Sequence, residues 1–282
     1  MSRQSPLPDW FDREAPVSPS EDQWATLDPS QREAVRAALP FVVEHDFMSE
    51  GDAHARAVLE ASEQLESFFG GSGPPKRPFY IGRSVMVHYP VEPGFAPDLF
   101  VVFDVPDHDR TSYVVLAEGR RLDFAFEVIS EGDRAKDLVR NVAKFARLGI
   151  SEYFVLDLNR RRLHGFRLSE GGGVYETLVP QLGRFESKTL GLRIGLEAGR
   201  ARFFVGDALL PTARELRARL EFNLQLAVDG QAAEAERAEA EAQKAEAEAK
   251  KAEAETQRAL MLEERNRELE ARIRELEAKL YN

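Results

Sequence analysis

The 282-residue sequence predicts a protein of the α/β (α+β) class, with a mixed β-sheet flanked by helices and a long C-terminal helix. A series of short apolar runs after Pro75 predicts the strands, and a helical segment between two of them predicts a βαβ crossover. The last quarter of the chain is dominated by Ala, Glu, Lys, Arg and Leu, whereas nearly all aromatic residues, Gly and Pro precede it. We therefore expect three parts: residues 1–39, 40–205 and 206–282.

The N-terminal part, residues 1–39, is expected to be a flexible leader with one short helix. Its first 28 residues are rich in Pro, Ser and Asp. Asp28 or Ser30 would cap a helix that continues through Ala38 and ends at Pro40. A clearer helix is expected from Asp52 to Phe69, where apolar residues recur at helical spacing before GGSGPP.

The sheet is expected from apolar runs bounded by turn residues. These runs cover residues 79–89, 98–104, 111–116, 124–129, 152–157, 163–168, 191–196 and 201–205. Between the fourth and fifth runs, residues 134–148 place Leu138, Val142 and Phe145 on one helical stripe. This segment is therefore the expected crossover helix, and Gly149 would end it.

The tail, residues 206–282, contains a seven-residue repeat and is expected to form a coiled coil. RAEAEAQ, KAEAEAK and KAEAETQ occupy residues 237–257, and a seam of larger side chains follows. That seam consists of Leu262, Asn266, Leu269, Ile273, Leu276 and Leu280, with a stammer at residues 256–262. A solvated single helix is the alternative, because an alanine seam buries little surface. We expect a homo-oligomer that associates through residues 259–280, with Asn266 fixing the register.

Composition limits the possible functions. The net charge of -11, acidic in both the tail and the rest, argues against strong nonspecific binding to nucleic-acid backbones. The chain has no cysteine, which excludes disulfides and thiolate metal sites. It lacks the apolar run of a signal peptide or membrane span, so we expect a cytoplasmic protein without membrane contact. No P-loop, GxSxG or HExxH motif occurs.

Two carboxylates stand where apolar strands are expected. Glu127 lies within LDFAFEVIS, and Asp98 follows Pro97 at the start of another apolar run. A buried ionised carboxylate is costly unless a cation or hydrogen-bond donors pair with it. Either acid alone would more often pair with Arg or Lys at a sheet edge. Together, on adjacent strands, they predict a site for a hard divalent cation such as Mg²⁺, with Mn²⁺ as a possible substitute.

The order of these segments resembles the Uma-type restriction endonucleases, which have the PD-(D/E)XK nuclease fold. The resemblance rests on Pro97-Asp98 before an apolar strand, then Glu127-Val128-Ile129-Ser130, then FARLGISEYFVLD, and it covers roughly residues 46–168. It implies a restriction-endonuclease-like domain over residues 40–205 that hydrolyses phosphodiester bonds of DNA. It also implies that Asp98 and Glu127 are ligands of a catalytic Mg²⁺.

The sequence departs from this family at the active-site lysine. The usual position, two residues after the acid, holds Ile129, and the alternative position on the following helix holds Asn141. At about 100° per residue, Lys136 and Lys144 lie on another face of that helix. We expect Lys136 to serve, because it stands in the first turn, whereas Lys144 is about two turns farther on. A solvated helix face is the alternative for these lysines.

The first long helix could add a third acid, since it offers Asp52, His54 and Glu60. His54 and Glu60 are six residues apart and cannot face the same way, so Glu60 is expected to be an ordinary exposed residue. The missing lysine also supports an alternative function, a catalytically inactive nuclease-fold protein that acts as a coiled-coil binding or scaffold module.

Overall fold

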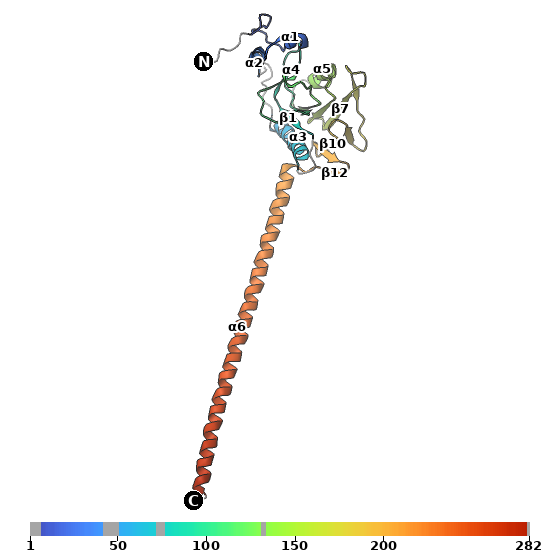
Figure 1. Ribbon diagram of the computed structural model, residues 1–282. Helices are drawn as coiled ribbons and strands as arrows, with labels where there is room; N and C mark the ends of the chain where they lie inside the picture. Colours follow the sequence, from blue (N-terminus) through green and yellow to red (C-terminus); the bar gives the residue numbers. More distant parts are fainter. Residues whose placement is uncertain (1–6, 42–50, 72–76, 131–133, 281–282) are drawn as a thin grey trace. The chain divides into compact units, whose positions relative to one another are not determined.

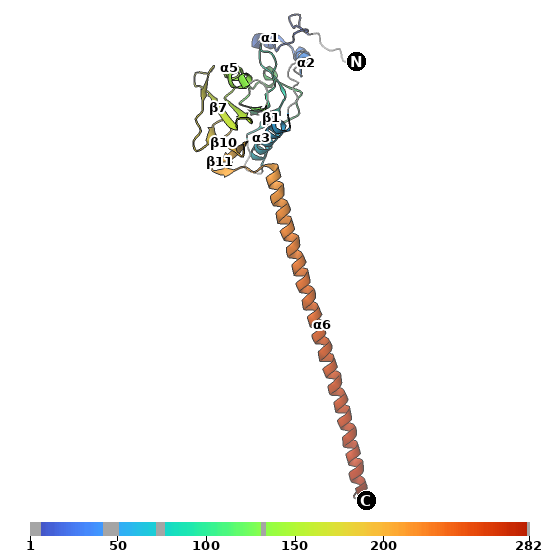
Figure 2. The same ribbon diagram turned by 180° about the vertical axis from the view of Figure 1, so that it is seen from behind.

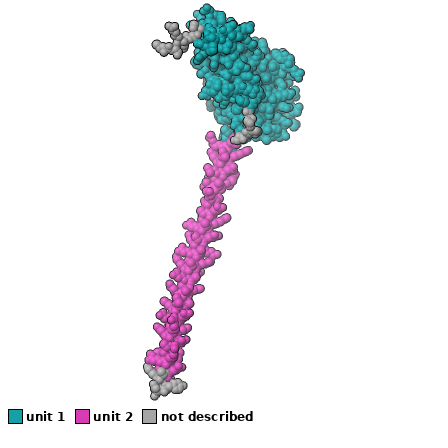
Figure 3. Space-filling model, viewed as in Figure 1, with its two compact units in different colours: residues 1–215 teal, residues 216–282 magenta. Residues whose placement is uncertain are grey.

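The computed structural model describes residues 7–41, 51–71, 77–130 and 134–280. The chain divides into two compact units, residues 1–215 and residues 216–282 (Figure 3). The GGSGPP segment expected to end the first long helix lies partly outside the described residues. Among the described helices, none combines the length and apolar character that a bilayer crossing would need.

The N-terminal segment differs from the flexible leader that its composition suggested. It forms α1 (Glu21–Thr26) and α2 (Pro29–Ala38), and each begins with a capping box. Ser20 and Gln23 form the first box, and Asp28 forms the second with Gln31, so Asp28 is the cap of α2. Both helices contribute to a small apolar cluster: Phe11, Trp24, Leu27, Val35, Leu39 and Val114. The leader is ordered because it buries these side chains.

The central sheet has six strands in the order β1, β3, β5, β6, β7, β8. Their bounds are β1 Phe79–Arg83, β3 Leu99–Phe103, β5 Phe124–Ile129, β6 Glu152–Asp157, β7 Arg162–Leu168 and β8 Tyr175–Thr177. All neighbours are antiparallel except β5 and β6, which run parallel. The expected crossover between β5 and β6 is therefore present, and the α/β prediction is confirmed.

Two expected strands are shorter than predicted. The run at residues 79–89 divides into β1 and β2 (Met86–His88), because Ser84 between them has a left-handed backbone with a φ of 50°. The run at residues 111–116 becomes β4 (Ser112–Val114) followed by the short α4 (Val115–Glu118). β2 and β4 pair with each other in parallel, outside the central sheet.

The central sheet is covered on both faces (Figures 1 and 2). One face packs against α3 (Asp52–Gly70) and a four-stranded antiparallel sheet. That second sheet consists of β9 (Arg184–Ser187), β10 (Leu192–Glu197), β11 (Arg200–Val205) and β12 (Ala208–Leu209). The other face packs against α5 (Asn141–Leu148) and the β2–β4 pair. Side-chain alternation along β5 follows this division: Phe124, Phe126 and Val128 face α3, whereas Ala125 and Ile129 face α5.

The crossover helix is not a regular α-helix. Its first part, η1 (Lys136–Arg140), is a π-helix, and α5 continues directly from it. The backbone N–H of Asn141 donates to the carbonyl of Lys136, five residues earlier. Each residue of a π turn advances through a smaller angle than in an α-helix, so side chains in η1 depart from the positions that regular helical spacing predicts.

The second unit consists of the greater part of α6 (Ala213–Leu280). A reciprocal cap begins this helix, since the Thr212 hydroxyl accepts from the N–H of Glu215 and the Glu215 carboxylate accepts from the N–H of Thr212. Every residue from 216 to 277 is exposed. The heptad seam predicted from sequence is therefore helical, and from Leu262 to Leu276 it is exposed to solvent in the single chain.

Candidate functional site: a buried carboxylate pair

The pairing of β3 with β5 brings the two predicted carboxylates together. The antiparallel register places Leu99 opposite Phe126, so Asp98 stands opposite Glu127. The N–H of Asp98 donates to Oε2 of Glu127 at 3.3 Å, and the N–H of Val128 donates to Oδ2 of Asp98 at 2.7 Å. Both residues are buried, with exposures of 9% for Asp98 and 6% for Glu127. Asp98 and Glu127 thus form one cross-strand carboxylate pair.

His54 of α3 also contacts Asp98. It lies in the first turn of α3, is buried, and places Nε2 at 2.9 Å from Oδ2 of Asp98. Sequence reasoning named His54 on this helix without assigning it a partner. Two groups bind Oδ2 of Asp98, the His54 ring and the Val128 N–H.

The carboxylate pair carries an electrostatic cost. Burial, followed by the negative charges of Asp98 and Asp137, raises the pKa of Glu127 well above its ordinary value of 4.5. The positive charge of Lys136 acts in the opposite direction on the same pKa. Because burial and like charge both disfavour the ionised form, Glu127 binds either a proton or a cation more readily than an exposed glutamate does.

η1 adds a third acid that sequence reasoning missed. Burial, with the negative charge of Asp98, raises the pKa of Asp137 to about 6 against the opposing charge of Lys136. The amide nitrogen of Asn141 lies 3.0 Å from Oδ1 of Asp137 and 3.5 Å from Oε1 of Glu127, so it links the two acids. The Tyr153 hydroxyl on β6 donates to the backbone carbonyl of Asp137 at 3.0 Å and fixes η1 to the sheet.

The two candidate lysines occupy different environments. Lys136 is exposed at the start of η1, and its charge lowers the pKa of both Glu127 and Asp137. The ammonium of Lys144 lies 3.9 Å from the centre of the Phe95 ring, and burial lowers its pKa. Lys144 is thus committed to an aromatic contact. Ile129, at the position where the family resemblance implied a lysine, is buried in the apolar cluster against α5.

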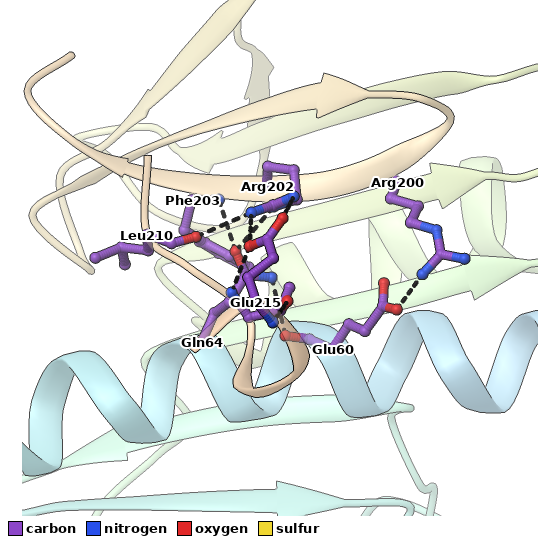
Figure 4. Close-up of polar contacts among 8 residues, drawn as sticks. Glu60, Gln64, Arg200, Arg202, Phe203, Leu210 and Glu215 are labelled. Atoms are coloured by element: carbon purple, nitrogen blue, oxygen red, sulfur yellow. Dashed lines mark hydrogen bonds and ion pairs between the residues drawn. The ribbon is translucent and has the colours of Figure 1, made fainter. Parts of the chain in front are cut away.

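Glu60 belongs to a separate polar network that attaches α3 to β11. Figure 4 shows Glu60 directed toward Arg200, with which it forms an ion pair. One turn later, the side-chain oxygen of Gln64 accepts from Arg202, whose guanidinium also binds Glu215 at 2.7 Å (Figure 4). Glu60 is therefore partly buried and ion-paired, not an ordinary exposed residue, and it adds no third acid to the pair.

This network affects His54, because Glu60 and Gln64 belong to the same helix as His54, α3. Arg202 and Gln64 are buried, at 9% and 1% exposure. Moving a partner away from a buried guanidinium would leave a desolvated, unpaired charge, which costs free energy. The residues that bind Arg202 are therefore restrained in position. The network therefore fixes the position of α3 and, through it, the position of the His54 ring. Asp52 at the start of α3 is exposed and makes no contact with the pair.

The donor set suits a hard divalent cation. Two carboxylates with an unfavourable mutual charge provide the oxygen ligands that Mg²⁺ prefers, and Mg²⁺ commonly takes only one or two protein carboxylates together with water and substrate oxygens. In the described part of the chain, no group of three or more His, Asp and Glu side chains is arranged to hold a metal ion. Asp98 and Glu127 could thus supply part of a coordination sphere but not a closed cage.

Comparisons with known proteins give two matches. A protein-family model described as "Uma2: Putative restriction endonuclease" matches residues 45–201. A similar solved structure is titled "Crystal structure of a putative nuclease belonging to DUF820 from Anabaena variabilis ATCC 29413"; it is 14% identical, covers 52% of this chain and 87% of that chain, and superposes with a TM-score of 0.37. None of the curated proteins compared matches the chain.

Proposed function

Since this chain belongs to the Uma2 family, whose model matches more than half of its residues, we propose that it is a Mg²⁺-dependent DNA endonuclease that hydrolyses phosphodiester bonds. Membership confirms the resemblance seen in the sequence and the restriction-endonuclease-like fold of the first unit. The family description supports a nuclease. The metal, the DNA substrate and the residue roles below are the proposal.

One observation carries the proposal: Asp98 and Glu127 are buried side by side where β3 and β5 pair. A structural acid of this protein has a different environment. Glu152, which is fully buried, is bound by Arg167 at 2.8 Å and by the N–H of Lys188 at 2.9 Å. Glu127 has no arginine partner among the described residues and faces a second carboxylate instead. Such an arrangement costs stability and is expected where function requires it.

Asp98 and Glu127 would hold the ion, and His54 would orient Asp98 by binding its Oδ2 atom. Bound there, Mg²⁺ or Mn²⁺ would stabilise the negative charge that develops on the phosphate during hydrolysis. Lys136 is the residue we assign to position the attacking water or the scissile phosphate, because it is exposed and its charge reaches Glu127. Lys136 and Arg140 of η1 would also contact DNA phosphates, which position the substrate without reading its sequence.

The test is cleavage of supercoiled plasmid DNA by the full chain with Mg²⁺ or Mn²⁺. Glu127→Gln keeps the shape of the side chain and removes its charge, so we expect it to abolish cleavage. Glu118→Gln is the matched control, because Glu118 is a partly buried glutamate that pairs with Arg110 at 3.0 Å and belongs neither to the carboxylate pair nor to the α3–β11 network. Equal cleavage by wild type and Glu127→Gln would refute the proposed site, and loss of cleavage only in Lys144→Ala among the lysine variants would refute the role of Lys136.

A second function is favoured by a specific observation, the absence of a lysine at both positions where the family resemblance implied one. Ile129 is buried among apolar side chains and Asn141 binds the acids through its amide. In this alternative the protein keeps the nuclease fold and binds DNA or another partner without cleaving it. Binding of Mn²⁺ or DNA without cleavage, with the same affinity in Lys136→Ala, would support this alternative over the enzyme.

A further inference from the structure

The end of α6 carries a row of exposed apolar side chains. Leu262, Leu269, Ile273 and Leu276 have exposures of 59%, 49%, 54% and 49%. Together with Asn266 they are separated by alternating steps of four and three residues, as in the seam of a coiled coil. A helix of 68 residues with such a row and no described buried residue beyond Glu215 lacks the packing that normally stabilises helices.

The type of residue at each seam position selects the number of strands. The steps place Asn266 and Ile273 at a positions and Leu262, Leu269 and Leu276 at d positions of the heptad. A β-branched residue at a combined with leucine at d favours two parallel strands. A single asparagine at an a position specifies register and oligomeric state, because it is satisfied only by the asparagine of an aligned partner.

The flanking charges select the direction of the partner. In this heptad, Arg258, Arg265 and Arg272 occupy g positions, and Glu263, Glu270 and Glu277 occupy e positions. In a parallel pair each g residue faces the e residue five positions later on the partner, so all three contacts would join arginine to glutamate. In an antiparallel pair g faces g and e faces e, so the same contacts would join like charges.

The ion pairs that these arginines form within their own helix do not prevent them from pairing with glutamates of a second helix. Arg265 pairs with Glu268 at 3.3 Å and Arg272 pairs with Glu275 at 3.0 Å within the same helix. All four side chains are at least half exposed, and ion pairs of this kind contribute little to stability. They can therefore be replaced at small cost by pairs between two helices.

We propose that residues 259–280 form a parallel, in-register, two-stranded coiled coil with a second copy of this chain. The inference does not depend on nuclease activity. Because the first unit precedes the helix in each chain, a parallel pair joins two such units to the same end of the coiled coil. The structure does not describe the side chains of residues 278–280. Leu280 is assigned to the next a position from the sequence spacing alone.

The first test measures the mass of the full chain by light scattering after size-exclusion chromatography. We expect a particle of twice the 31.7 kDa chain mass. Leu269→Glu, at a d position, should give the monomer mass. The matched control is Leu260→Glu, which places the same charge on a similarly exposed leucine outside the seam and should remain dimeric. A monomeric or trimeric wild type would overturn the proposal, as would a dimer that Leu269→Glu leaves intact.

The second test determines strand direction, and the absence of native cysteine makes it specific. Ala259→Cys places one thiol at the a position that begins the seam. In a parallel, aligned pair the two thiols face each other, so oxidised glutathione should convert most of the protein to a covalent dimer. Adding Leu269→Glu should abolish the cross-link. A dimer that neither Ala259→Cys nor Leu276→Cys alone cross-links, but that the double variant Ala259→Cys/Leu276→Cys does cross-link, would show an antiparallel pair and overturn the proposal.

Discussion

Replacing Asp137 by asparagine should stabilise the metal-free protein in a pH-dependent manner. Asp137 lies in η1 beside the carboxylate pair, and its pKa is raised to about 6 by burial and by the charge of Asp98. A carboxyl group with a raised pKa in the folded state binds its proton more tightly there than in the unfolded chain. Its contribution to stability is therefore fully present below the unfolded pKa and is lost as the pH rises through the folded pKa.

The size of the effect follows from the two pKa values. Each pKa unit corresponds to about 1.4 kcal/mol, so the difference between 3.8 and about 6 amounts to a penalty of about 3 kcal/mol at most when the group is fully ionised. Part of that penalty is already present at about pH 4.5, so we expect the advantage of Asp137→Asn over wild type to increase by about 2 kcal/mol between about pH 4.5 and pH 8. Asparagine does not titrate, so its pH-independent effects cancel in this comparison. It also removes the charge that raises the pKa of Glu127, which adds to the increase in the same direction.

The assay is urea unfolding of both proteins in EDTA at the two pH values, with the free energies of unfolding compared. Asp104→Asn is the control of opposite sign, because the hydrogen bond from Arg77 lowers the pKa of Asp104. Its wild-type carboxylate stabilises the protein above the unfolded pKa, so Asp104→Asn should lose stability at the higher pH. An Asp137→Asn effect that is equal at both pH values, or that becomes less favourable as pH rises, would refute this electrostatic account of the site.

Three further outcomes are expected. His54→Ala should weaken Mn²⁺ binding about 10- to 100-fold, because partners of metal ligands contribute that much; unchanged affinity by isothermal titration would contradict its positioning role beside Asp98. Asn141→Lys should raise the single-turnover cleavage rate at least about tenfold, since positioned proton donors and acceptors contribute more than this; a rate equal to wild type would count against placing the missing lysine there. Phe126→Ala should destabilise the protein by about 3–5 kcal/mol, because Phe126 is fully buried against α3; a loss below about 1 kcal/mol in urea unfolding would contradict the packing described.

The carboxylate pair could be predicted from the sequence because strand geometry is regular. Side chains alternate between the two faces of a strand, so Glu127 stood out against the apolar residues beside it. Asp98 at the start of a neighbouring apolar run then offered a partner. Antiparallel pairing of β3 with β5 satisfies both patterns at once, and it places the two residues opposite each other.

The surroundings of the pair could not be predicted in the same way. Treating residues 134–148 as one regular α-helix gave no reason to place Asp137 beside the acids, because the π-helical turn forms together with tertiary contacts such as the bond from Tyr153 to the Asp137 carbonyl. The aspartate and the asparagine four residues later were nonetheless a visible signal of a linked polar pair.

The order of the N-terminal segment was also missed. Its composition suggested disorder, although a serine and a glutamine three residues apart, Ser20 and Gln23, signalled a capped helix. Composition does not show tertiary packing, and Trp24 and a few other apolar residues of this segment are buried in a small cluster with Val114.

If Asp98 and Glu127 bind an ion as proposed, the register between β3 and β5 also links ion binding to correct strand pairing. A slip of one residue would turn Glu127 to the other face of the sheet, among the apolar residues beneath α3, and would separate it from Asp98. Only the native pairing presents two carboxylates to one ion. Mg²⁺ present during folding would therefore stabilise the correctly paired chain by mass action and reduce the population of the chain with slipped strands.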